Sequence, residues 1–287
     1  MILGFPGSLD TIYSGLAKMG RVICVCNQKG GVGKTTTAVN VASCLALSEK
    51  RTLLIDLDPQ ANASSGLGIR LAKGEQSVYH LLLGHEDVAH ITRSTELEYL
   101  RIVPSSQDLI GAEVELVGLS SRERKLKEGL GDVKNQYDYI FIDCPPSLGF
   151  LTLNALVAAD SVLIPIQCEY YALEGVSNLL NTIKRVRSTY NNALQIEGFL
   201  LTMFDPRNNL SRQVVENVKN NLSSQVFETI IPRNVRLSES PSFGKPVVLY
   251  DITSRGAVGY LALSKEIMDA EAQGNTEKAA CGFGTGS

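Results

Sequence analysis

The sequence has no surplus of positive charge, since its 27 Lys and Arg residues are outnumbered by 30 Asp and Glu residues and the formal net charge is −3. A protein that binds nucleic acid through its overall charge is basic, so any such binding here has to come from a local patch or from dimerisation. The sequence also lacks an apolar run long enough to cross a bilayer, so we expect no membrane-spanning helix. Its 287 residues and 44% hydrophobic content are sufficient for one large core.

The cysteines form no C-x-x-C pair, and the histidines form no metal-ligand pattern. The six cysteines are Cys24, Cys26, Cys44, Cys144, Cys168 and Cys281, and most lie in or beside apolar runs. This spacing predicts reduced, buried thiols in a cytosolic protein rather than a disulfide framework. The histidines at positions 80, 85 and 90 would spread around a helix axis, so we expect no metal site from them.

The two ends of the chain differ in composition from the middle. Residues 1–18 contain an early proline and three glycines without a cationic start, which makes them a poor signal peptide. Met19 directly precedes the first apolar run and could itself be a start site. Residues 274–287 are rich in Gly, Ala and Thr, as is typical of a flexible tail. We therefore expect one domain at 19–273, after an extension of unknown role at 1–18.

Apolar runs typical of strands alternate with helical patterns along the chain. We expect strands at 21–27, 52–57, 97–103, 137–143, 161–167, 196–203 and 226–231. We expect helices at 35–48, 108–116, 122–130, 151–158, 173–190, 211–222 and 257–271. This alternation predicts a single α/β domain, resembling the phosphate-loop NTPases, with a mostly parallel, twisted sheet and helices on both faces.

The most informative segment lies between the first predicted strand and the first long helix. It consists of Lys29, Gly30, Gly31, Val32, Gly33, Lys34, Thr35 and Thr36. A Gly-rich turn between a strand and a helix directs successive backbone N–H groups into one concavity at the positive end of the helix, where phosphate binds. Lys34 is expected to reach the β- and γ-phosphates, and the Thr35 hydroxyl is expected to bind Mg²⁺.

The start of this loop departs from the usual phosphate-loop pattern. Gln28 stands where that pattern has glycine, and a second lysine, Lys29, lies at the mouth of the loop. Lys29 is either a solvated residue at a loop start or a cation that reaches phosphates, including those of a neighbouring subunit. The strand, turn and helix around the loop favour a nucleotide site over a plain Gly-rich turn.

Aspartates follow two of the predicted strands. Asp56 and Asp58 end the second strand, and Asp143 ends the strand at 137–143. In open α/β sheets, ligands bind at the carboxyl ends of the strands, where an aspartate commonly holds Mg²⁺ in phosphate-loop enzymes. Pro59 fixes the backbone after Asp58, so this carboxylate is expected beside the γ-phosphate, where it can orient water and accept its proton. Asp56 is expected nearer the Mg²⁺. Each aspartate alone is equally compatible with a turn cap.

These motifs together resemble the ParA/Soj-type partition ATPases, within the ParA/MinD family of deviant Walker A ATPases. The similar segments lie between Met19 and Met268, at 27–37, 56–60, 143–147, 167–175 and 231–239. The last two are similar to the chromosomal Soj branch. Residues 1–18 and 274–287 have no counterpart in the family pattern.

The resemblance implies an ATPase with ATP and Mg²⁺ as cofactors, weak alone and stimulated by a partner. It implies a cytoplasmic, nucleoid-associated protein for chromosome or plasmid partitioning. Its ATP-bound sandwich homodimer would bind DNA non-specifically. A ParB/Spo0J-type centromere-binding protein would stimulate ATP hydrolysis, which releases the dimer from DNA.

The resemblance also implies a role for each motif residue. Lys29 would contact the phosphates of the opposite subunit, and Asp58 would be the hydrolysis aspartate. The residues implied at the Mg²⁺ are Thr35, Asp56 and Asp143, with Asp143 as the Walker B carboxylate. The residues implied at the adenine are Pro232, Arg233 and Asn234.

DNA binding is implied at Arg207 and Arg236, and the charges alone support it weakly. Basic residues are spread over the last third of the chain, and a dimer would double their number. Phosphate contacts from such residues give salt-dependent binding without sequence preference. An ordinary solvated surface would have the same composition.

Two related classes share the phosphate loop. A membrane-associated regulator of the MinD type needs a basic amphipathic C-terminal helix, and residues 271–281 have no bulky apolar face. Cluster-carrying relatives such as the nitrogenase iron protein need a cysteine several residues past the Walker B aspartate. Residues 147–150 contain none, and Cys144 lies too close to the nucleotide side.

Overall fold

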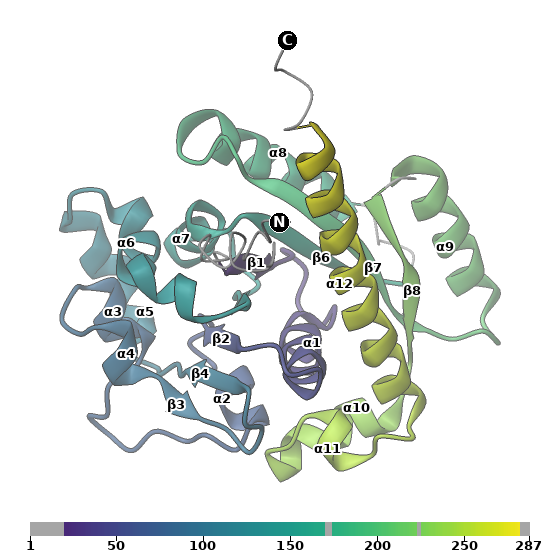
Figure 1. Cartoon of the computed structure of the whole chain (residues 1–287), viewed down its shortest axis with the longest axis horizontal. Helices are drawn as coiled ribbons and strands as arrows, with labels where there is room; N and C mark the ends of the chain where they lie inside the picture. The colour runs from purple at the N-terminus through teal and green to yellow at the C-terminus, as the bar shows by residue number, and fades with distance from the viewer. Residues whose placement is uncertain (1–19, 170–173, 223–224, 282–287) are drawn as a thin grey trace, which may run out of the picture.

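An eight-stranded sheet forms the middle layer, in the order β3-β4-β2-β5-β1-β6-β7-β8 (Figure 1). The computed structural model describes residues 20–169, 174–222 and 225–281. The strands are β1 (Arg21–Val25), β2 (Thr52–Asp56), β3 (Arg93–Ser94), β4 (Leu100–Val103), β5 (Tyr139–Asp143), β6 (Ser161–Gln167), β7 (Gln195–Phe204) and β8 (Val226–Pro232). All neighbouring strands are parallel except β3 and β4. The predicted parallel sheet is confirmed.

The side chains of each central strand alternate between two apolar layers, because successive residues of a strand point to opposite faces. Val22 and Cys24 of β1 belong to one layer, and Ile23 and Val25 belong to the other. The first layer is covered by α3 (Val78–Leu82), α4 (Val88–Ile91), α5 (Leu109–Glu115), α6 (Lys125–Leu130), α7 (Phe150–Ala158), α8 (Glu174–Thr189) and α9 (Asn209–Leu222). The second layer is covered by α1 (Lys34–Leu47), α2 (Asn62–Gly66), α11 (Val247–Tyr250) and α12 (Arg255–Cys281).

The elements that the sequence did not predict are short. They are the edge strand β3 and the helices α2, α3, α4, α10 (Val235–Glu239) and α11. Four or five residues complete little more than one turn, so they show no 3.6-residue periodicity. Within the described residues, 3₁₀ segments at Leu116–Gly118 (η3), Arg122–Arg124 (η4), Gly131–Gln136 (η5) and Ser240–Phe243 (η7) lie in the connections.

The last helix is longer than the sequence predicted. The prediction ended it at residue 271 and began a flexible tail at 274, whereas α12 continues to Cys281. Ala, Gln, Glu and Lys make up most of 271–281 and are strong helix formers, while a single glycine costs only about 1 kcal/mol. The predicted extension at 1–18 and the end of the tail at 282–287 lie outside the described residues.

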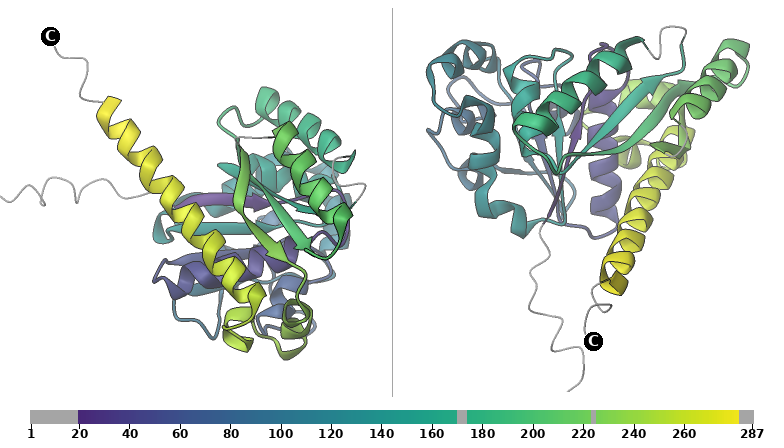
Figure 2. Two further views of the ribbon diagram at one scale, coloured as in Figure 1. Left: turned by 90° about the vertical axis from the view of Figure 1, so that its right-hand side faces the viewer. Right: turned by 90° about the horizontal axis from the view of Figure 1, so that it is seen from above.

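α12 fixes the position of the first helix. It lies against both β8 and α1, and Figure 2 shows it crossing the domain and projecting past the end of the sheet. The Tyr260 hydroxyl lies 3.1 Å from the Thr37 hydroxyl, and both side chains are buried. Across the part of the chain that the structure describes, no helix has the length and apolar content needed to span a membrane.

The centre of the sheet creates a crevice at its carboxyl edge. β1 lies between β5 and β6, and the chain continues from β1 to β2 on the β5 side but reaches β7 and β8 on the β6 side. Loops that leave neighbouring strands in opposite directions leave a gap where ligands bind. The segment after β1 opens into this gap.

We expect Asn191→Ala to lower the free energy of unfolding by about 1–3 kcal/mol, since buried acceptors would lose their donor. The Asn191 side-chain nitrogen donates to the carbonyl oxygens of Leu156, Val157 and Ala159 at 3.1, 3.3 and 2.7 Å, which closes the end of α7. Urea denaturation would measure the loss. Asn192→Ala is the matched control, because Asn192 is exposed. Equal stability of the two variants would contradict this role.

Candidate nucleotide-binding site

The Gly-rich loop has the backbone conformation that a phosphate-binding loop requires. Gly31 and Gly33 have φ angles of 74° and 89°, a left-handed region that favours glycine. The Gly33 carbonyl accepts the first helical hydrogen bond of α1, from the Thr37 amide at 2.8 Å. A Cβ atom at Gly30 or Gly31 would meet no atom within 4 Å. The loop is therefore open on its outer side, where a ligand would lie.

Residues of β6 and β7 hold the loop in place. The Thr202 hydroxyl donates to the Val32 carbonyl at 2.9 Å. The Asn27 side chain donates to the Pro165 carbonyl at 2.7 Å and accepts from the Lys29 amide at 3.1 Å. These contacts fix the loop to β6, the neighbour of β1, and to β7, the next strand.

Lys34 lies inside the loop. It is the first residue of α1, is 7% exposed, and donates from Nζ to the Lys29 carbonyl at 3.0 Å. Burial lowers the pKa of Lys34, and the nearby Asp143 carboxylate partly offsets this effect. A buried lysine whose Nζ rests on the loop's own carbonyl is well placed to transfer to phosphate oxygens, because phosphates would supply the missing negative charge.

Three carboxylates lie together at the ends of β2 and β5. These strands are neighbours, and Asp56 pairs with Asp143 in the parallel register. Asp56 is fully buried and accepts hydrogen bonds from the amide and hydroxyl of Ser64, both at 2.7 Å, and from the Asp58 amide at 3.2 Å. Burial raises the pKa of Asp56 to about 6, although these hydrogen bonds act in the opposite direction.

Asp143 has no such partners. Both of its carboxylate oxygens are buried without a hydrogen bond among the described residues. Burial, then the charges of Asp56 and Asp58, raise the pKa of Asp143 well above its ordinary value. Thr35 and Lys34 lower it in part, but the Thr35 hydroxyl does not reach hydrogen-bonding geometry. Asp143 therefore has two free oxygens for a cation.

The residues fit a magnesium ion that is bound mainly through a ligand. No set of three His, Cys, Asp or Glu within the described residues is arranged to hold a metal alone. Mg²⁺ typically binds through one or two protein oxygens plus phosphates and water. The geometry favours Asp143 with the Thr35 hydroxyl as these protein oxygens, since the oxygens of Asp56 already accept from Ser64 and Asp58.

Asp58 is the third carboxylate of the cluster. It is 7% exposed, and its Oδ1 accepts from the Gln60 amide at 2.9 Å. The Asp58 carbonyl accepts from the Ser105 hydroxyl at 2.6 Å. The aspartate is thus held at both its backbone and its side chain, and one carboxylate oxygen stays available.

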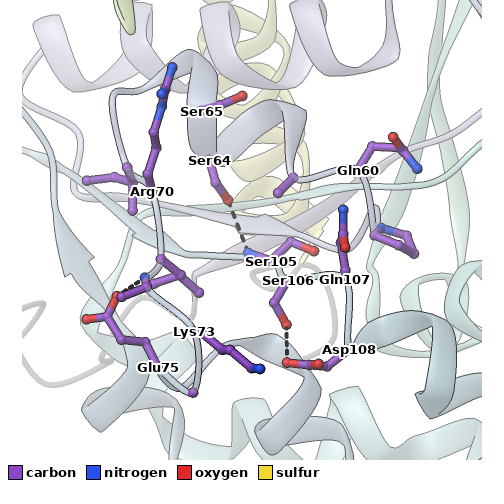
Figure 3. A pocket seen from close by; sticks show the side chains of 16 residues that line it. Gln60, Ser64, Ser65, Arg70, Lys73, Glu75, Ser105, Ser106, Gln107 and Asp108 are labelled. Carbon is purple, nitrogen blue, oxygen red and sulfur yellow. Dashed lines mark hydrogen bonds between the residues drawn. The ribbon is translucent and has the colours of Figure 1, made fainter.

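An open pocket of about 780 Å³ lies beside this cluster (Figure 3). Figure 3 shows Ser64 and Ser105 joined across it, where the Ser105 amide donates to the Ser64 hydroxyl at 3.1 Å. Because Ser64 also bonds Asp56 and Ser105 also bonds Asp58, the wall of the pocket is linked to both aspartates.

The predicted adenine turn lies beside the phosphate loop. Pro232, Arg233 and Asn234 line a cavity of about 310 Å³ together with Gly33 and Thr36. The structure therefore joins these two distant motifs in one site. Asn234 also caps α10, since its side-chain oxygen accepts from the Arg236 amide at 2.9 Å.

Lys29 pairs with Glu169, an acidic residue for which no role was predicted. Its Nζ lies 3.8 Å from the Glu169 carboxylate, and Arg233 lies 3.6 Å from the same carboxylate. Glu169 thus connects the mouth of the phosphate loop to the adenine turn. The Lys29 side chain is 37% exposed, unlike that of Lys34, which is buried.

The two arginines predicted to bind DNA lie outside the phosphate site. Arg207 follows β7, is 88% exposed, and pairs with Asp205 at 2.9 Å. Arg236 pairs with both Glu239 and Asp251, at 2.9 and 3.2 Å. Two carboxylates beside Arg236 cancel its local charge, so Arg207 is the stronger candidate for a phosphate contact.

The open glycine loop, its buried lysine, the strand-end carboxylates and the base-sized cavity define a phosphate-loop nucleoside triphosphatase. Residues 20–196 match the model of a family described as an AAA domain. The chain is 59% identical to the chromosome partitioning protein ParA of Myxococcus xanthus, over 88% of this chain and 90% of that one. It belongs to the ParA/Soj-type family of chromosome-partitioning ATPases.

Two further similarities agree with this family. The sporulation initiation inhibitor protein Soj of Bacillus subtilis is 59% identical, over 87% of this chain and 98% of that one. A crystal structure described as cobyrinic acid a,c-diamide synthase from Mycobacterium smegmatis, with bound ADP and magnesium, is 36% identical with a TM-score of 0.79. It covers 89% of this chain and 97% of that one.

Some residues of the site were not predicted from the sequence. Glu169, Ser64 and Ser105 contact the predicted residues. Ser64 and Ser105 lie outside the motifs named above, and Glu169 lies in the segment 167–175 but had no predicted role. Met203 lines the base cavity and has a φ of 54°, an unusual conformation for a residue other than glycine. Only the three-dimensional contacts reveal these four residues.

We expect Asp143→Asn to reduce the pH dependence of stability in the nucleotide-free protein. An acid with a raised folded-state pKa stabilises the fold while protonated, and this contribution is lost as pH rises from the unfolded value, about 4, towards the folded one. Relative to the variant, the wild type should be less stable at pH 8 than at pH 5. Urea denaturation at several pH values measures this difference.

The control for this comparison is Asp269→Asn, at an exposed position of α12. It should keep the wild-type slope. If Asp143→Asn also keeps that slope, the Asp143 carboxylate is not the strained group of the cluster.

Proposed function

We propose that this protein hydrolyses ATP with Mg²⁺ as part of a DNA-partitioning cycle, and that its activity is weak until a partner stimulates it. The observation that carries the proposal is the unpartnered Asp143 carboxylate beside Lys34 and Thr35, under an open phosphate loop. A relative named as a chromosome partitioning protein, at 59% identity, supports the cycle.

The residues divide the work of binding ATP. Backbone amides of the loop and Lys34 Nζ bind the phosphates, and the cavity at Pro232 and Asn234 accepts the base. Asp143 and Thr35 would hold the Mg²⁺. The metal would neutralise charge that develops on the β- and γ-phosphates during transfer.

Asp58 is proposed to orient the attacking water. Its Oδ1 is fixed by the Gln60 amide, which leaves the other oxygen to accept a proton from water. Because Asp58 donates its backbone amide to Asp56, its position depends on the cluster behind it.

Lys29 is proposed to act on a second subunit in an ATP-bound homodimer. In this monomer its side chain is partly exposed and is restrained by Glu169 at 3.8 Å rather than by the loop. A long, weakly paired cation at the mouth of the loop is suited to contact phosphates bound by a facing copy. A cation supplied in trans contributes about 10³-fold or more in comparable enzymes.

The ATP-bound dimer is proposed to bind DNA non-specifically and to associate with the nucleoid. Arg207 lies at the carboxyl edge of the sheet, past the end of β7, and its only described carboxylate contact is the exposed pair with Asp205. DNA phosphates can replace such a surface partner, since exposed ion pairs are weak. A ParB-type centromere-binding protein is the proposed activator of hydrolysis.

Amide synthesis is the second activity named among similar structures. That structure is 36% identical, whereas the relatives named as partitioning proteins reach 59%. Partitioning is therefore the better-supported proposal. ATP hydrolysis measured with and without non-specific DNA and the centromere-binding partner tests it directly, since an amide synthase would not respond to either.

We expect Asp58→Ala and Lys29→Ala to fail at different steps. Asp58→Ala should bind ATP and accumulate as a dimer, with hydrolysis reduced by about 10²–10⁴-fold, since it loses only the water-orienting group. Lys29→Ala should bind ATP through Lys34 but remain monomeric and inactive. Fluorescent-nucleotide titration, sedimentation velocity and phosphate release distinguish the two.

Two reference variants define the scale of these effects. Lys34→Ala should lose nucleotide affinity, and Lys265→Ala, at an exposed position of α12, should match the wild type. If Asp58→Ala loses affinity as severely as Lys34→Ala, or if Lys29→Ala dimerises normally with ATP, the corresponding role is wrong.

We expect Arg207→Ala to weaken DNA binding equally for all DNA sequences and to reduce the salt dependence of binding, because one phosphate contact is lost. ATP affinity should not change. A salt titration in the presence of ATP measures both the DNA affinity and its salt dependence. Arg187→Ala is the control, because Arg187 lies in the last turn of α8, at the opposite edge of the sheet. If Arg207→Ala keeps the wild-type DNA affinity and salt dependence, Arg207 is an ordinary surface residue and not a DNA contact.

A further inference from the structure

The helix α5 and the 3₁₀ segment η3 that follows it carry an apolar stripe on their outer face. The stripe consists of Ile110, Val114 and Val117, which are 64%, 75% and 54% exposed. Their spacing of four and three residues places them on one side of the helical segment. The opposite side, with Leu109 and Ala112, is fully buried in the core. The stripe is therefore not needed to attach this segment to the domain.

This stripe lies beside the nucleotide site. α5 starts a few residues after β4 ends, at the same edge of the sheet as the Gly-rich loop. Glu113, within the stripe segment, packs on Gly149, where an added Cβ would lie 2.1 Å from its carboxylate oxygen. Gly149 belongs to the loop that follows Asp143. Asp108, at the start of α5, also lines the pocket beside the carboxylate cluster, so this end of the segment lies next to the candidate nucleotide site.

Exposed charges of both signs flank the stripe along the chain. Asp108 and Glu115 are exposed on its α5 side, and Arg124, Lys127 and the acid Glu128 are exposed on η4 and α6, the next segments of the chain. A two-fold interface joins the same patch of two subunits, so acids of one copy can face bases of the other. A patch with an apolar centre and a mixed rim suits a second copy of this chain better than a purely basic or purely acidic partner.

We propose that the apolar stripe is covered by a second copy of this chain when the protein dimerises with ATP. The inference rests on the proposed function, because Lys29 can reach the partner's phosphates only if the partner faces this edge. Apolar patches at such positions mark interaction sites. The stripe would add buried apolar area to an interface whose other contacts, around the nucleotide, are charged. Nucleotide binding would be required for the two copies to associate.

The test introduces a charge into the stripe. Val114→Glu should raise the ATP-dependent dimer dissociation constant at least tenfold, while nucleotide affinity of the monomer is unchanged. Sedimentation velocity over a concentration series with a non-hydrolysable ATP analogue measures the first quantity, and fluorescent-nucleotide titration measures the second. Val258→Glu is the matched control, because Val258 is 55% exposed on α12 and should not affect dimerisation.

Val117→Ser is a milder second variant, used if thermal unfolding shows that Val114→Glu is destabilised. It should weaken the dimer in the same direction. If the wild type dimerises with the analogue and both stripe variants match it, the inference about the stripe is overturned while the proposed dimer stands. If the wild type itself stays monomeric with the analogue, the proposed dimer fails, and the inference fails with it.

Discussion

The confinement of three carboxylates at one edge of the sheet is the constraint on which the rest of the site depends. Asp56 and Asp143 are fully buried, Asp58 nearly so, and like charges in a water-poor region repel one another. Ser64 relieves Asp56 with two hydrogen bonds, whereas nothing in the described residues relieves Asp143. The nucleotide-free protein therefore retains an unfavourable arrangement that a cation and its phosphates would remove.

The topology of the sheet produces this confinement. The parallel register sets Asp56 opposite Asp143 on neighbouring strands, and β1 on the other side of β5 delivers the glycine loop to the same edge. β7 and β8 add Thr202 and the base cavity from the far side. Every ligand-facing group thus follows a strand end, and only the order of the strands brings these groups together.

The sequence predicted the parts of the site that are contiguous. The glycine loop, Asp56, Asp58, Asp143 and the turn at 232–234 each have a local pattern, and the structure brings them to one edge. The pairing of Glu169 with Lys29 depends on how separate loops meet, which no spacing encodes. Likewise, the spacing did not show that Glu239 and Asp251 both pair with Arg236. These pairs make Arg236 a weaker candidate for a DNA contact. Short elements such as α2 and β3 were too brief for periodicity to show.

The contact between Thr37 and Tyr260 links the orientation of α12 to that of α1. Thr37 lies one turn into the helix that begins at the phosphate loop, and Tyr260 lies near the start of a helix of 27 residues. At about 1.5 Å per residue such a helix is roughly 40 Å long. A tilt of α1 by a few degrees would therefore move the far end of α12 by ångströms. The far end of α12 is a natural place to attach a reporter of events at the phosphates.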